Sequence, residues 1–125
     1  MNKADLIEMI LGGSSTKNNS AALEELRKLD IMLIKADIPH KYWPRQICYY
    51  GKNEPPKSKP GEYVGPGWGA VCSVIADGYG CEEGLLEIKG LMTDEECQRV
   101  HNTVLGHLTA ENIFARIKAH WDSIA

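Results

Sequence analysis

Residues 70–91, AVCSVIADGYGCEEGLLEIKGL, contain two apolar runs separated by a glycine-rich turn. The first run, residues 70–76, is apolar almost throughout and rich in β-branched side chains, which is typical of a strand in the middle of a sheet. The second run, residues 85–91, alternates between an apolar and a charged face (Leu86 and Ile88; Glu87 and Lys89). The stretch therefore predicts two neighbouring strands, the second of which has a polar face.

Further elements are predicted on both sides of this pair. One strand is expected before it and a short one after it (residues 45–50 and 103–108). Helices are indicated by apolar spacing or by capping residues (residues 3–11, 20–36, a short one from Thr93, and 110–123). Consecutive strands with short links favour an antiparallel sheet with helices on one face. We therefore expect a single α+β domain over residues 1–125: a small antiparallel sheet of three to four strands, with two N-terminal helices and one C-terminal helix packed against it.

Apolar residues on the two long helices indicate which of their sides are buried. Residues 31–34, IMLI, are apolar on nearly every side, so this end of the second helix is predicted to be deeply buried. The last helix carries a stripe that we expect to face the sheet (Ile113, Phe114, Ile117, Trp121 and Ile124).

The composition is ordinary for a globular domain, with 125 residues, 43% hydrophobic and 25% charged. Because 14 Lys and Arg stand against 17 Asp and Glu, the net charge is −3, which argues against binding to nucleic-acid backbones. No apolar run approaches the ~20 residues that cross a bilayer. The N-terminal stretch contains Asp5 and Glu8, unlike a signal peptide. We expect a cytoplasmic protein without membrane contact, whose cysteines are reduced thiols.

A proline- and glycine-rich segment, residues 51–69, is inserted between two of the predicted strands. Its five glycines and four prolines nearly exclude regular structure. Six of the nine aromatic residues fall between positions 42 and 68. Tyrosine and tryptophan suit a protein interface or a stacked base, and lysine suits an acidic partner. The candidate partner- or ligand-binding residues are Tyr42, Trp43, Lys52, Lys57, Lys59, Tyr63 and Trp68, and the alternative is an insertion without function.

The cysteines and histidines offer one conceivable metal set. Cys97 and His101 are four residues apart, and Cys72 and Cys81 flank the turn, so together they could form a Cys₃His zinc site. The spacing contains no CxxC pair, however, and Cys72 lies within an apolar run, so we expect no metal and no cofactor. Two glutamates adjoin Cys81 and disfavour a reactive thiolate. No nucleophile and no acid–base pair stand out, and we expect the protein not to be an enzyme.

Several stretches of the chain resemble a group of small phage and prophage proteins of Firmicutes that have no assigned activity. These are VCSVI, the YG turn, GLLEI and LTAENIFARI and, more loosely, LIKADIPHKYWPRQICYY. Together they span somewhat more than half of the chain. The resemblance implies a phage accessory protein, and it brings no catalytic residue with it.

These observations favour a non-catalytic phage accessory protein that binds a host protein, such as a factor of anti-phage defence, and inhibits or modifies it. The alternative is a protein that sequesters a small nucleotide signal in an aromatic and basic pocket. A homodimer is compatible with both. The composition predicts a cytoplasmic protein, and the resemblance implies that this cytoplasm is that of the host cell.

Overall fold

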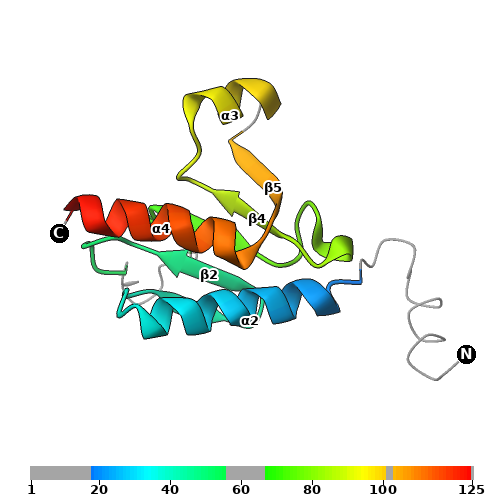
Figure 1. Ribbon diagram of the computed structural model, residues 1–125, viewed down its shortest axis with the longest axis horizontal. Helices are drawn as coiled ribbons and strands as arrows, with labels where there is room; N and C mark the ends of the chain where they lie inside the picture. The colour runs from blue at the N-terminus through cyan, green and yellow to red at the C-terminus, as the bar shows by residue number, and fades with distance from the viewer. Residues whose placement is uncertain (1–17, 56–66, 101–102, 125) are drawn as a thin grey trace, which may run out of the picture.

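The computed structural model describes residues 18–55, 67–100 and 103–124. Within them, five strands form one antiparallel sheet in the order β1-β2-β3-β4-β5 (Figure 1). The strands are β1 Lys41–Trp43, β2 Gln46–Tyr49, β3 Cys72–Ile75, β4 Leu86–Lys89 and β5 Val104–Leu108. The helices are α2 Ser20–Lys35 before the sheet, α3 Asp94–Val100 between β4 and β5, and α4 Ala110–Ile124 after it, with a 3₁₀ turn, η2 Cys81–Glu83, between β3 and β4.

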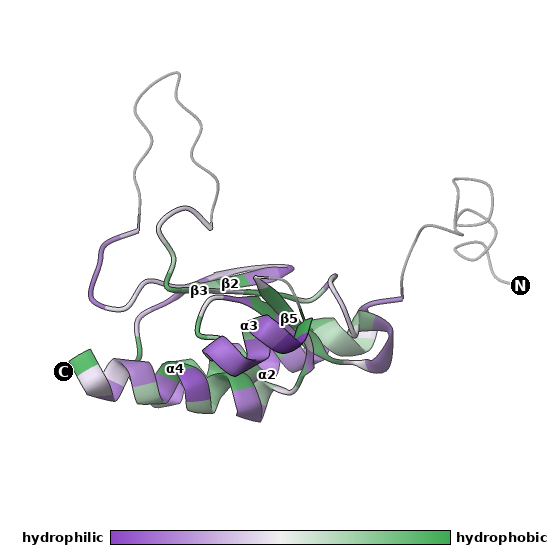
Figure 2. Ribbon diagram, turned by 90° about the horizontal axis from the view of Figure 1, so that it is seen from above, coloured by the Kyte–Doolittle hydropathy of each residue, from purple (hydrophilic) through white to green (hydrophobic). Residues whose placement is uncertain are grey.

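Two layers make up the body of the domain. α2 and α4 lie side by side across one face of the sheet, and Figure 2 shows the sheet and this helix pair one above the other. α3 projects from the end of the sheet at which β4 leads into β5. None of the helices in the described ranges combines the length and the apolarity that crossing a membrane requires.

The hydrophobic core lies between the sheet and the helix pair. β2, β3 and β4 contribute alternate side chains to it, as the two-residue period of a strand demands, and β5 contributes Leu105. The largest aliphatic side chains that are fully buried there are Leu26, Leu29 and Leu33 from α2, Ile113 and Ile117 from α4, and Ile47, Val74, Leu86 and Ile88 from the strands. Burial of these side chains is the main favourable contribution to folding.

Polar contacts join the helices to the sheet and to each other. The Tyr49 hydroxyl on β2 lies 2.8 Å from His120 Nδ1 on α4, with the two rings edge to face. At the entry to β1, His40 Nε2 lies 2.6 Å from Asp30 Oδ1 of α2. A carboxylate of α2, Glu25, accepts the Ala110 N–H at 2.7 Å and so caps the N-terminus of α4, where a negative charge is stabilising.

The antiparallel sheet and the α+β class are confirmed, but the expected count of three to four strands is wrong. The additional strand is β1, which pairs with β2 around a two-residue turn, Trp43 opposite Gln46. Three residues are too few to show a strand period, and the proline at position 44 favours a turn. The predicted fourth strand is confirmed as β5.

The arrangement of the helices also differs from the expectation of two N-terminal helices and one C-terminal helix. In the described ranges one helix precedes the sheet, one lies within it in chain order and one follows it. The helix predicted over residues 3–11 lies outside the described residues. The capping box predicted at Thr93 is confirmed, because the Thr93 N–H donates to Glu96 Oε1 at 2.9 Å and the Glu96 N–H donates to Thr93 Oγ1 at 3.1 Å.

Both helix burial patterns need correction. Ile31 and Ile34 are 42% and 61% exposed, because α2 packs with one side only and these positions lie away from it. On α4 the core positions are Ala110, Ile113 and Ile117. The other members of the predicted stripe, Phe114, Trp121 and Ile124, are partly buried or exposed, because they lie beside the stripe that contacts the sheet.

Candidate functional site

One face of the sheet is not covered by α2 or α4. Residues paired directly across antiparallel strands lie on the same face. Two such rows lie opposite the core, one across four strands (Trp43, Gln46, Ile75 and Glu87) and one across five (Lys41, Cys48, Ser73, Lys89 and Val104). We call the surface that these two rows form the open face.

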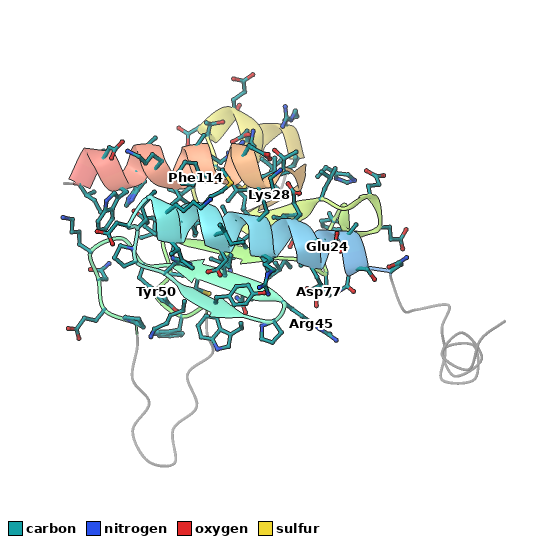
Figure 3. All side chains as sticks on the ribbon, turned by 60° about the horizontal axis from the view of Figure 1, so that its bottom comes forward. Glu24, Lys28, Arg45, Tyr50, Asp77 and Phe114 are labelled. Carbon is teal, nitrogen blue, oxygen red and sulfur yellow. The ribbon has the colours of Figure 1, made fainter. Side chains whose placement is uncertain are left out.

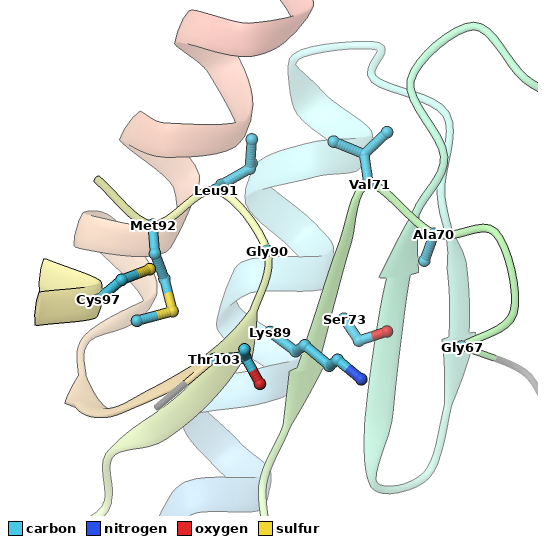
Figure 4. Close-up of a pocket in the computed structure, with 10 residues that line it drawn as sticks. All are labelled: Gly67, Ala70, Val71, Ser73, Lys89, Gly90, Leu91, Met92, Cys97 and Thr103. Carbon is cyan, nitrogen blue, oxygen red and sulfur yellow. The ribbon is translucent and has the colours of Figure 1, made fainter. Parts of the chain in front are cut away.

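The open face is hollowed by two adjoining depressions of about 420 and 380 Å³, which we call the groove; Figure 4 shows the smaller one. Both depressions are lined by Gly67, Ser73 and Lys89, so they meet over the middle of the sheet. The larger one is also lined by Gln46, Trp68, Ile75, Glu87 and Val104. The smaller one is also lined by Ala70, Val71, Gly90, Leu91, Met92, Cys97 and Thr103.

The two walls of the groove come from the two connections at one end of the sheet. The segment before β3 contributes Trp68, whose side chain is 70% exposed. Gly67 approaches the floor so closely that a Cβ atom there would lie 3.1 Å from Ser73 Oγ. The opposite wall consists of Met92 and Cys97, from the segment after β4 and from α3 (Figure 4).

The charged groups on the floor differ in how they are engaged. Glu87 is only 9% exposed and accepts the Tyr79 N–H at 3.2 Å, beneath the closely packed Gly78. The Lys89 side chain is exposed and extends from β4 toward Ser73 (Figure 4), and its ammonium group makes no ion pair within the described part of the chain. The groove therefore presents a cation at its centre, whereas the neighbouring carboxylate is already engaged.

Thiols near the floor are poor nucleophiles. Cys48 is fully buried, its Sγ lies 3.6 Å from Ser73 Oγ, and burial raises the pKa of the thiol. Burial also raises the pKa of Cys72, on the core side of β3, to about 12, and that of Tyr50 to about 12. A thiol with a raised pKa stays protonated at neutral pH and does not attack.

The cysteines considered for zinc lie in different environments. Cys72 and Cys81 belong to the hydrophobic core, and Cys97 lies on α3 at the wall of the groove. His101 lies outside the described residues. Among the residues that the structure describes, no three His, Cys, Asp or Glu side chains gather in a way that could hold a metal ion.

The candidate binding residues are divided among several surfaces. Trp43 belongs to the open face, together with Gln46 of the larger depression, and Trp68 stands at the rim of the groove. Tyr42 is paired with the core residue Ile47 and therefore lies on the helix side of the sheet edge. The Lys52 ammonium lies 4.9 Å from the ring centroid of Trp121 on α4, also away from the groove. Lys57, Lys59 and Tyr63 lie outside the described residues.

Sequence reasoning did not select the central residues of the groove, Ser73 and Lys89, or the wall residue Met92. One signal was present, because the alternation of residues 85–91 already assigns Lys89 to the polar face of its strand. No sequence pattern indicates which face of the sheet α2 and α4 leave free, since that depends on where both helices pack.

An ion pair holds α3 in its place beside the groove. Arg116 of α4 donates from Nη1 and Nη2 to the two carboxylate oxygens of Glu96, at 2.7 and 2.6 Å, and from Nη1 to the Leu91 carbonyl at 3.1 Å. The two hydrogen bonds from Arg116 to the Glu96 carboxylate, with one from the Thr93 backbone, lower the pKa of Glu96 to about 2. Such a two-pronged arginine–carboxylate pair fixes geometry as well as charge.

Glu96→Gln is expected to lower the free energy of unfolding at pH 7 by about 1–2 kcal/mol, since one charged partner of a largely covered pair is lost. Because the folded-state pKa lies below the ordinary 4.5, the contribution of Glu96 is complete above pH 4.5 and disappears as the pH falls toward 2. Urea unfolding at pH 7, 4 and 2.5 measures this. The matched control is Glu95→Gln, at an exposed neighbouring position. Equal losses in the two variants would contradict the structural role of the pair.

Comparison of the chain with protein-family models, with curated proteins and with solved structures finds no match. The resemblance to phage and prophage proteins therefore stays a prediction.

Proposed function

We propose that the protein acts by binding, without catalysis, and that it docks a partner protein onto the groove of the open face. The observation that carries this proposal is the position of Trp68, which is 70% exposed at the rim of a concave sheet surface that neither α2 nor α4 covers. Tryptophan is the residue type most enriched among those that dominate interface energies. In line with the resemblance described above, the partner we propose is a host protein, bound in the cytoplasm by a phage accessory protein.

The neighbourhood of Trp68 supports a protein partner. Trp43 is 36% exposed on the same face, so two large aromatic side chains are available on one surface. Apolar side chains of the groove, such as Ile75 and Met92, lie beside polar ones, such as Gln46 and Ser73. A mixture of aromatic anchors with satisfied polar groups is typical of interfaces between proteins that also exist separately.

The chemistry of the floor supports binding in preference to catalysis. A catalytic nucleophile needs a base within hydrogen-bond reach. The thiol under the groove, that of Cys48, is buried, has a raised pKa and has the Ser73 hydroxyl as its neighbour.

A second candidate is the sequestration of a small nucleotide, and the position of Lys89 favours it. Lys89 lines the same depression as Trp68, so a base stacked on the indole could place its phosphate near the ammonium group. A nucleotide released from the purified protein on denaturation and identified by chromatography would select this candidate.

Trp68→Ala is expected to weaken partner binding by about 10–100-fold, the effect of removing an anchor residue. The tagged wild-type protein and the variant are each used to recover the partner from host lysate, and the affinity of the isolated partner is then measured by calorimetry. The matched control is Ile34→Ala, which removes another exposed apolar side chain, 61% exposed, from the helix side. If Trp68→Ala binds like the wild type and Ile34→Ala does not, the docking surface is α2 and the proposal is wrong.

A further inference from the structure

We propose that the groove recognises an extended acidic segment of the partner, whose central carboxylate pairs with Lys89 and whose two flanking apolar side chains fill the two depressions. This inference rests on the proposed function and names the chemistry of the partner. Two properties of the groove support it, its charge and its apolar surface.

The open face carries a net positive charge, whereas the whole protein carries a net negative charge. The two rows contain three charged side chains, Lys41, Lys89 and Glu87. Both lysines are exposed, whereas the Glu87 carboxylate is largely covered and accepts the Tyr79 N–H, so the exposed charges on this face are positive and outnumber the covered negative one. The net charge of the chain is −3. An acidic partner would be attracted to this face and repelled by much of the remaining surface, which gives orientation as well as affinity.

Two other charged side chains near the sheet, Arg45 and Asp77, do not line the groove. Figure 3 shows Arg45 and Asp77 near one another at the end of the sheet opposite the walls of the groove. The Ala76 N–H donates to the Arg45 carbonyl at 3.0 Å, which holds the two turns together there. Lys89 is thus the cation on which a ligand in the groove would converge, and the Ser73 hydroxyl beside it can donate a second hydrogen bond to a carboxylate.

Apolar surface lies on both sides of Lys89. Leu91 and Met92 line the smaller depression, whereas Ile75, Val104 and Trp68 line the larger one. Lys89 belongs to both, so it lies between two apolar subsites. In an extended peptide, alternate side chains point to the same side. A segment of the pattern apolar-x-acidic-x-apolar therefore presents its three recognition groups to the groove in the order that the groove offers.

The test uses two synthetic peptides with blocked ends, Ser-Leu-Ser-Glu-Ser-Leu-Ser and the same peptide with Gln in place of Glu. Each is titrated into the ¹⁵N-labelled protein while amide shifts are recorded. We expect the acidic peptide to shift amides of Ser73, Lys89, Leu91 and Val104 and to bind at least about fivefold more tightly than the neutral one at low salt. Its advantage should disappear as sodium chloride is raised, because salt screens the ion pair.

Variants separate the ion pair from the surface around it. Lys89→Gln should abolish the preference for the acidic peptide, Lys89→Arg should retain it, and Lys35→Gln, which removes an exposed lysine of α2, should leave it unchanged. Equal binding of both peptides with shifts on the open face would overturn the acidic specificity and leave the proposed docking surface standing. Shifts confined to other surfaces, or no binding of either peptide, would overturn the inference, and the Trp68→Ala measurement then decides the proposed function independently. Shifts of the same amides by adenosine monophosphate, with none by the acidic peptide, would replace it with the nucleotide candidate.

Discussion

Gly90→Ala is expected to lower the free energy of unfolding by about 3–4 kcal/mol. Gly90 follows β4 with a φ of +97°, a conformation that side chains rarely adopt. A Cβ atom there would lie 2.1 Å from the carbonyl oxygen of Val71, which is backbone and cannot rotate away. The clash can be relieved only by separating β4 from the segment that leads into β3. Urea unfolding followed by circular dichroism measures the loss.

The matched control for this prediction is Gly69→Ala. Gly69 has a similar φ, +73°, but no heavy atom lies within 4 Å of the position that its Cβ atom would take. Only the backbone strain remains, so the expected cost is about 1 kcal/mol. The difference between the two variants measures the steric contact alone. If both variants lose the same free energy of unfolding, Gly90 does not lie as close to the Val71 carbonyl as the structure shows.

Ile117→Ala is expected to lower the free energy of unfolding by about 3–4 kcal/mol, through the lost transfer of the side chain from water and the cavity that it leaves. Ile117 is fully buried in the cluster between α4 and the sheet. The m-value should stay nearly unchanged, since one truncated side chain hardly alters the total surface that unfolding exposes.

Phe114→Ala is the matched comparison for Ile117→Ala, because both residues lie on α4. Phe114 lies on α4 at the margin of the core and is partly buried (Figure 3), so the expected cost is about 2 kcal/mol although phenylalanine is the larger residue. The reverse order, with Phe114→Ala the more damaging, would mean that α4 is rotated about its axis relative to the structure described above.

Local patterns in the sequence predicted most of the fold. Alternation and β-branched content located β2, β3, β4 and β5, and the Thr93 capping box located α3, because these signals act within one element. β1 was missed because its three residues form a strand only by pairing with β2. The exposure of Ile31 and Ile34 could not be predicted either, since an apolar helix end is buried only where another element covers it.

The candidate site was harder to predict from the sequence than the fold. The pairing register of the strands decides which residues share a face, and no local pattern shows that register. Trp43 and Tyr42 are neighbours in the chain, yet the pairing of β1 with β2 places them on opposite faces of the sheet. Ser73 and Lys89, in contrast, are far apart in the chain and paired directly in the sheet. Composition drew attention to the aromatic residues, among which Trp68 lines the groove. Which lysine lies in the groove depends on how the strands pair, and the sequence alone does not show this pairing.

The order of the strands along the sheet has a consequence for how this domain could diversify. Because the strands follow one another in chain order, the connections alternate between the two ends of the sheet, and those from β2 to β3 and from β4 to β5 leave from the same end. These are the connections that carry Trp68 on one side and Met92 on the other. Insertions and exchanges in such connections are tolerated far better than changes inside strands. New ligand preferences could therefore arise by altering either wall, while the strand pairings and the packing of α2 and α4 are inherited unchanged.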